Sequence, residues 1–148
     1  MKPRQKVSPA RMREYLAQLK KREEGKKPSE MRMAVQSILS RYAGVVRTEE
    51  GLRKGLKELM GLKKERIVPD EKGLSFALET ENIRDVAEMV LRACLIRKES
   101  RGPHLFFGRF DDPGPLPIQD PKWRRYIVLR NRIGRMVLRK QVPVKLEV

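Results

Sequence analysis

Side chains that could do chemistry are densest in the segment ESRGPH, residues 99–104. It contains His104, the only histidine of the chain, and follows Cys94, the only cysteine. Because a histidine titrates near neutral pH, His104 could position or protonate a substrate if it faced the active site of a partner. The alternative is a structural imidazole that hydrogen-bonds to the backbone. The sequence leaves both interpretations open.

The sequence offers few other residues that could form a catalytic site or bind a metal or cofactor. Asp111, Asp112 and Asp120 lack the spacing of a calcium-binding loop, and Pro-Gly-Pro follows the first two. One cysteine and one histidine supply neither a metal site nor a cysteine–histidine catalytic pair. The glycine-rich turns that bind dinucleotides or phosphates are also missing. We therefore predict no catalytic, cofactor-binding or metal-binding residue, and a chain that is not catalytic alone.

Composition restricts the class of partner. The 148 residues include 35 lysines and arginines against 19 aspartates and glutamates, a net charge of +16. Such a charge attracts an acidic protein, nucleic acid or an anionic membrane. The cations extend from Lys2 to Lys145 and alternate with acids in the middle of the chain, so the sequence has no obvious phosphate-tracking stripe. A basic RNA- or DNA-binding module is the alternative function, in which Trp123 would stack on a base instead of anchoring a loop.

Cysteine content and hydropathy indicate the compartment. A single cysteine excludes an internal disulfide and fits a reducing environment. No apolar run approaches the roughly 20 residues needed to cross a bilayer, and no apolar stretch follows residues 1–4 as it would in a signal peptide. We expect a cytoplasmic protein, free or at the cytoplasmic face of a membrane complex.

Apolar residues spaced three and four apart predict four helices. The first covers about residues 10–22, the second runs from a Ser29 cap to Tyr42, and the others cover about residues 49–64 and 76–98. Thr48 is a suitable cap for the third helix, and the strong apolar pattern of the fourth includes Val86 and Val90. Arg97 to Arg101 would finish this fourth helix, and Gly102 would terminate it.

The rest of the chain predicts a loop and a hairpin. Five of the ten prolines fall between Gly102 and Pro121, which excludes regular helix there. Residues 123–138 alternate apolar with basic side chains around the turn sequence NRIG, residues 131–134. An isolated hairpin is marginally stable, so we expect it to pack on the helices or to complete a sheet in another polypeptide.

Together these elements predict a mainly α fold. It consists of a three- to four-helix, spectrin-like bundle, an extended loop rich in proline and glycine, and a small C-terminal β-hairpin. We divide a single domain into an N-terminal helix and linker (1–27), a helical bundle (28–102), and a tail of loop and hairpin (103–148).

Three segments in fixed order carry a resemblance to a known family. They read YAGVVRTEEGL (42–52), ENIRDVAEMV (81–90) and ESRGPH (99–104), and Trp123 follows them. This succession, over about residues 28–130, resembles the C-terminal helical domain of the fumarate reductase and succinate dehydrogenase flavoprotein family. That family also includes L-aspartate oxidase and the adenylylsulfate reductase alpha subunit. The sequence departs from it after His104, where LFFGRF replaces the arginine, acid and proline that many members have nearby.

The resemblance implies a three-helix bundle with an extended tail that packs against a flavin-binding domain. It implies FAD in a partner polypeptide, a further partner in the form of an iron–sulfur subunit, and an electron-transfer complex in which this chain has a supporting role. We expect a non-catalytic subunit or detached C-terminal domain of an FAD-dependent fumarate reductase- or succinate dehydrogenase-like oxidoreductase. Because the chain starts at Met1 with a helix of its own, we favour a separately encoded subunit.

The family segments supply the candidate interface. Arg47, Glu99 and Arg101 are expected to form salt bridges that fix the helices or reach the partner. Phe106, Phe107 and Trp123 are expected to be apolar anchors, and the excess positive charge would face an acidic partner. The complete set is Arg47, Asn82, Glu99, Ser100, Arg101, Gly102, His104, Phe106, Phe107 and Trp123.

Overall fold

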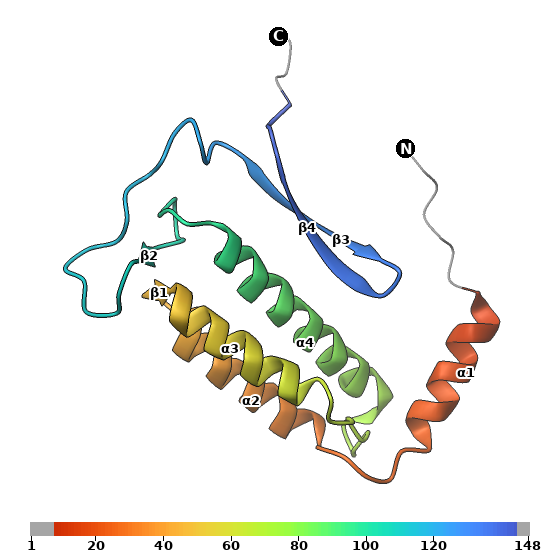
Figure 1. Ribbon diagram of the computed structural model, residues 1–148. Helices are drawn as coiled ribbons and strands as arrows, with labels where there is room; N and C mark the ends of the chain where they lie inside the picture. Colours follow the sequence, from red (N-terminus) through yellow and green to blue (C-terminus); the bar gives the residue numbers. More distant parts are fainter. Residues whose placement is uncertain (1–7, 145–148) are drawn as a thin grey trace.

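The computed structural model describes residues 8–144, which form four helices followed by a β-hairpin (Figure 1). The predicted fold class, a mainly α bundle with a proline-rich loop and a C-terminal hairpin, is confirmed. In this described part no helix is both long and apolar enough to span a membrane. In chain order the elements are α1 (Pro9–Lys20), α2 (Pro28–Tyr42), β1 (Arg47–Thr48), α3 (Glu49–Leu62), α4 (Gly73–Ile96), β2 (Phe106–Phe107), β3 (Tyr126–Arg132) and β4 (Arg135–Gln141).

Helices α2, α3 and α4 pack pairwise around one hydrophobic core. Each contributes one apolar stripe, and burying a large aliphatic side chain contributes roughly 1.5–3 kcal/mol. Phe106 of the following loop joins the same core, so the loop is part of the packed structure. The buried core residues are Met31, Val35, Ile38, Leu52, Leu59, Ile67, Ala77, Ala87, Leu91 and Phe106.

The starts of two helices test the predicted caps. Thr48 caps α3, because its Oγ1 accepts a hydrogen bond from the backbone N–H of Gly51 at 3.0 Å. The predicted Ser29 cap is wrong, since α2 begins one residue earlier at Pro28. Proline suits the first helical position because its missing N–H would be unpaired there anyway. The Ser29 hydroxyl instead accepts a hydrogen bond from Nζ of Lys72 at 2.8 Å.

The buried face of α4 differs from the predicted apolar stripe. Val86 and Val90 are exposed, while Arg84 and Glu88 turn inward. Nη1 of Arg84 donates to the carbonyl oxygens of Leu62, the last residue of α3, at 3.2 Å and of Glu65 at 2.8 Å. Buried charges are tolerated where such partners compensate for lost hydration. Apolar periodicity alone therefore assigned the wrong face to part of this helix.

Helix α1 and the hairpin flank the three-helix core (Figure 1). Leu19 of α1 is completely buried, and Arg22 in the linker forms an ion pair with Glu81 of α4 at 2.9 Å. Strands β3 and β4 pair in antiparallel register through the turn at Ile133 and Gly134, as predicted. Both strands contact α4, so the hairpin packs on the helices.

Candidate functional site

The segment between α4 and the hairpin, residues 97–125, folds back across the end of the bundle where α3 begins (Figure 1). Strands β1 and β2 form a parallel pair, with Arg47 opposite Phe106. The N–H of Ser100 donates to the carbonyl oxygen of Leu116 at 3.2 Å. The N–H of Leu116 in turn donates to the carbonyl oxygen of Phe106 at 2.6 Å. Residues 99–104 are therefore fixed on one side by β1 and on the other by the proline-rich stretch.

Residues 101–104 form a tight turn. The N–H of Arg101 donates to the carbonyl of His104 at 2.9 Å, and the reciprocal bond measures 3.1 Å. Gly102 stands at the corner with φ +57, a conformation that favours glycine. The prediction that Gly102 terminates the fourth helix is wrong, because α4 already ends at Ile96. The glycine serves the turn that presents His104.

His104 bridges two parts of the chain. Its Nε2 lies 3.1 Å from the carbonyl oxygen of Arg97, and its Nδ1 lies 3.3 Å from Nη1 of Arg47. A carbonyl only accepts and a guanidinium only donates, so this geometry assigns a neutral ring protonated at Nε2. Burial lowers the pKa of His104. The hydrogen bond to the carbonyl of Arg97 raises this pKa, but the nearby charges of Arg47 and Arg97 lower it, and the net shift is downward. The geometry is that of the structural imidazole.

Glu99 is the charged centre of the cluster and is completely buried. Its Oε1 accepts hydrogen bonds from Nη1 of Arg97 at 2.7 Å and Nε of Arg101 at 2.8 Å, and its Oε2 accepts one from the N–H of Gln119 at 2.6 Å. Burial raises the pKa of Glu99, but the hydrogen bonds from Arg101, the Gln119 backbone and Arg97 outweigh it and lower the pKa to about 2. Glu99 and Arg101, both expected to form salt bridges, pair with each other within the chain.

The apolar residues of the predicted set pack inside this cluster. Ser100 Oγ accepts a hydrogen bond from the N–H of Phe106 at 2.9 Å and donates to the carbonyl of the same residue at 3.2 Å. Phe106, Phe107 and Trp123 are buried, whereas Phe110 is exposed. Lys140 Nζ lies 3.7 Å from the ring centroid of Trp123, while the buried indole Nε1 has no hydrogen-bond partner among residues 8–144.

The structure gathers the predicted residues at this end of the bundle, except for Asn82. Asn82 is exposed on α4, about four helical turns before the end of that helix. Arg47 forms no salt bridge that fixes the helices, since no carboxylate in the described chain lies within 4 Å of it, and a salt bridge from Arg47 to a partner stays a prediction. Its Nε donates to the carbonyl of Ala43 and its Nη1 to that of Pro103, each at 3.0 Å. The free carbonyls after α2 and in the turn satisfy this guanidinium instead.

Three residues of the cluster escaped the sequence analysis: Arg97, Gln119 and Asp120. Arg97 was assigned to the last turn of a helix, but its backbone is extended and its side chain pairs with Glu99, two residues further along the chain. Asp120 binds Arg101 from the far side of the proline-rich loop. Pairing across such a loop depends on the path of the chain, which no local pattern records. The only signal in the sequence for these partners was Glu99 itself, because a carboxylate that becomes buried needs several hydrogen-bond donors around it.

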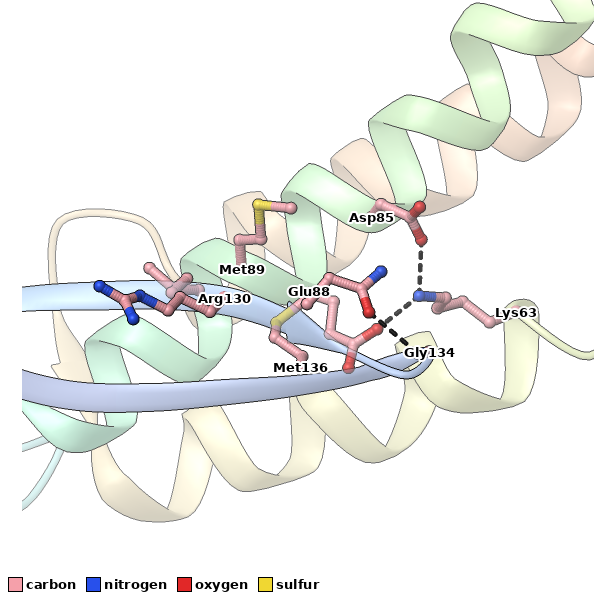
Figure 2. Close-up of a pocket in the computed structure, with 9 residues that line it drawn as sticks. Lys63, Asp85, Glu88, Met89, Arg130, Gly134 and Met136 are labelled. Carbon is pink, nitrogen blue, oxygen red and sulfur yellow. Dashed lines mark hydrogen bonds and ion pairs between the residues drawn. The ribbon is translucent and has the colours of Figure 1, made fainter. Parts of the chain in front are cut away.

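The cluster has little capacity for chemistry. Glu99 is a poor general base near neutral pH because its pKa is so low, and the described residues contain no group of three or more potential metal ligands. A cavity of about 210 Å³ lies elsewhere, between α4 and the hairpin (Figure 2). There the Lys63 ammonium lies between the carboxylates of Asp85 and Glu88. The carboxylate of Glu99 and the ammonium of Lys63 are both paired within the chain, which favours a structural role for these two groups.

Comparisons with known proteins agree with this geometry. The family model described as fumarate reductase flavoprotein C-term matches residues 32–127. One polypeptide of the CoM/CoB fumarate reductase of Methanothermobacter marburgensis is 31% identical over 114 residues, which cover 72% of this chain and 20% of that protein. L-aspartate oxidase 2 of Ralstonia nicotianae is 39% identical over 72 residues, or 47% of this chain and 13% of that protein.

A solved structure extends the likeness to the whole fold. Adenylylsulfate reductase from the hyperthermophile Archaeoglobus fulgidus superposes with a TM-score of 0.76 at 21% identity, over 97% of this chain and 26% of that one. The chain thus spans about a quarter or less of the length of each of these relatives. Its helices, loop and hairpin correspond to one part of a larger protein architecture. The chain belongs to the family of fumarate reductase flavoprotein C-terminal domains.

Proposed function

We propose that the chain is a non-catalytic component of an FAD-dependent, fumarate reductase- or succinate dehydrogenase-like oxidoreductase, in which it docks on the flavin-bearing polypeptide and stabilises it. The family membership over residues 32–127 carries this proposal. The relatives are several times longer than this chain, and FAD would be held by the partner. An iron–sulfur subunit would be a further partner, and the complex would work in the cytoplasm or at its membrane face.

The bracing cluster, defined as Arg47, Arg97, Glu99, Arg101 and His104, supports a structural contribution. Its buried carboxylate is held by two guanidinium groups, and its imidazole links β1 to the turn. Such a satisfied network fixes the path of the loop across the end of the bundle. A rigid surface costs less conformational entropy when it binds, so the cluster would favour docking by holding the shape of the chain in advance.

The test is co-purification from the native source. An affinity-tagged full chain, eluted at moderate salt, should carry a polypeptide with flavin absorbance, and mass spectrometry should identify that polypeptide as a flavoprotein of this family. Adding the purified chain to its separated partner should raise the thermal midpoint of that partner, because ligands that bind only the folded state stabilise it. A preparation without a flavoprotein would contradict the proposal.

The same preparation tests nucleic-acid binding, for which charge is the only argument. Bound nucleic acid would give ultraviolet absorbance that nuclease removes and that declines steeply with salt. Neither the family match nor the relatives support this alternative. Flavin retained after nuclease treatment would favour the oxidoreductase component.

A further inference from the structure

The positive charge of the chain is concentrated outside the three-helix bundle. Residues 28–121, which include the three-helix bundle and the bracing cluster, carry 16 lysines and arginines against 15 aspartates and glutamates. Residues 122–141, which include the hairpin, carry eight lysines and arginines and no acid. None of these eight has a carboxylate within 4 Å among residues 8–144. The bundle neutralises its own charge, whereas the hairpin does not.

Strand alternation sorts the hairpin residues onto two faces. Leu129, Arg130 and Met136 line the cavity against α4, where Arg130 and Met136 are seen in Figure 2. Lys140 lies over the ring of Trp123, so this side of the hairpin is turned to the rest of the chain. The register places the opposite set on the other face, which we call the arginine face. It consists of Tyr126, Val128, Arg132, Arg135, Val137, Arg139 and Gln141; Arg130 is left out because it lines the cavity.

The arginine face is unfavourable in isolation. Arg132 pairs directly with Arg135 across the two strands, and like charges in that position destabilise a hairpin. Arg139 adds a further exposed cation on the same side. The isolated chain has no acid on this face to offset the repulsion, so an external carboxylate surface would relieve it.

The tip of the hairpin adds an apolar contact. Ile133 is fully exposed and has φ +51, a backbone conformation that β-branched residues rarely adopt. Type I′ turns usually place asparagine, aspartate or glycine there. The tip of the hairpin therefore presents an exposed apolar side chain between the cations Arg132 and Arg135. Such a side chain can pack on a protein surface, whereas a phosphate backbone offers it no apolar contact.

The composition of the arginine face favours a protein over a nucleic acid. All its cations are arginines, and Tyr126, Val128 and Val137 lie among them. Arginine and tyrosine are enriched at protein interfaces and lysine is depleted. A guanidinium also binds a carboxylate through two parallel hydrogen bonds, which fixes orientation as well as charge.

We propose that the arginine face and Ile133 form the docking surface for an acidic patch on the flavin-bearing polypeptide, an inference that rests on the function proposed above. Arg97 of the bracing cluster then holds the base of the hairpin, because its guanidinium donates to the carbonyls of Trp123 at 3.3 Å and Arg125 at 2.7 Å, and the hairpin makes the contact. Recognition occurs between arginines of this chain and carboxylates of the partner, with Ile133 inserted beside them.

The experiment compares two charge reversals in the tagged full chain. Arg132→Glu with Arg135→Glu changes the arginine face, and Lys57→Glu with Arg66→Glu makes the same change in net charge at exposed positions of the bundle region. At equal protein recovery and equal circular dichroism, the first variant should retain at least tenfold less co-purified flavoprotein than wild type. The second should retain nearly as much as wild type.

A second measurement does not depend on the stability of the charge-reversed hairpin. Arg135→Lys keeps the charge and supplies an amine, so zero-length carbodiimide coupling should join residue 135 to an aspartate or glutamate of the flavoprotein. Mass spectrometry would identify the coupled peptides. The matched Arg66→Lys variant should give no such product at residue 66.

The outcomes separate the two proposals. If wild type and the hairpin variant retain equal flavoprotein and residue 135 does not couple, the docking surface is wrong while the proposed function stands. If wild type retains no flavoprotein, both are overturned. If wild type instead retains nuclease-sensitive nucleic acid that the hairpin variant loses, the assigned class of partner is wrong.

Discussion

Nη1 of Arg47 lies 3.3 Å from Nδ1 of His104, although 57 residues separate them in the sequence. The other ring nitrogen of His104 faces the carbonyl oxygen of Arg97. The ring therefore accepts on one side and donates on the other, and only the neutral form can do both. Protonation would place an N–H against the guanidinium of Arg47 and weaken the link between β1 and the turn.

The first prediction concerns pH. Burial lowers the pKa of His104 in the folded chain below its ordinary 6.5, so the unfolded chain binds more protons just below that pH. The free energy of unfolding should therefore decrease as pH falls through 6.5. Urea titrations at successive pH values would measure it. His104→Gln should flatten this slope, and an unchanged slope in that variant would contradict the assignment.

The second prediction concerns the buried carboxylate. Glu99→Gln should lower the free energy of unfolding by about 3 kcal/mol, because it leaves two partly buried guanidinium groups without their anion. Glu50, an exposed partner of Lys54 in α3, provides the control. Glu50→Gln should leave the free energy of unfolding nearly unchanged, because exposed ion pairs contribute little. Denaturant unfolding of both variants would make the comparison, and equal losses would argue against a central role for Glu99.

The same carboxylate predicts an acid transition. The folded pKa of Glu99 is about 2 against an ordinary 4.5, so its contribution is complete above pH 4.5 and is lost as pH falls towards 2. Wild type should lose more stability over this range than Glu99→Gln does. Unfolding followed by circular dichroism would detect the difference, and parallel pH profiles would rule it out.

A further prediction uses two glycines of α3. A Cβ added at Gly55 would lie 2.8 Å from Cβ of Tyr42, so Gly55→Ala should force α2 and α3 apart and cost about 1–3 kcal/mol. A Cβ at Gly61 would meet nothing within 4 Å, so Gly61→Ala should gain about 0.5–1 kcal/mol from reduced backbone entropy. Thermal unfolding should move the two midpoints in opposite directions. A gain at both positions would mean that the helices can separate freely there.

The last prediction concerns Trp123. Its buried Nε1 makes no hydrogen bond within the described chain, so Trp123→Phe removes no such bond and should cost only about 1 kcal/mol. Trp123→Ala should cost about 3–5 kcal/mol through the cavity it creates. Urea midpoints would compare the two. Equal losses would mean that the indole N–H has a partner in solution.

The sequence predicted the helices well because their information is local. Thr48 followed by two glutamates specifies the start of α3, and apolar spacing specifies the core face of α2 and α3. The turn at Ile133 and Gly134 was similarly local. Prediction failed where a buried polar residue replaced an apolar one, as at Arg84 and Glu88, since periodicity assigns charges to solvent.

The bracing cluster was only partly predictable. The order of the family segments drew attention to Arg47, Glu99 and His104, but not to how they pair. Arg47 has carbonyl partners because α2 ends beside the turn, and Glu99 gains Arg97 because α4 stops early. Both facts depend on where the chain folds back. The arginine face was also missed, because the total net charge does not show that the bundle is nearly neutral and that the hairpin carries cations without acids.

The loop across the end of the bundle is anchored on both sides of Arg109. On the N-terminal side of this exposed residue, β2 pairs with β1. On its C-terminal side the chain returns to the same end of the bundle, where it is held through Leu116, Gln119 and Trp123. A protease that cut the chain after Arg109 would leave two fragments held together without a covalent link. The hairpin would stay seated on α4, so a nicked chain would migrate as one particle in its native form and separate only when denatured.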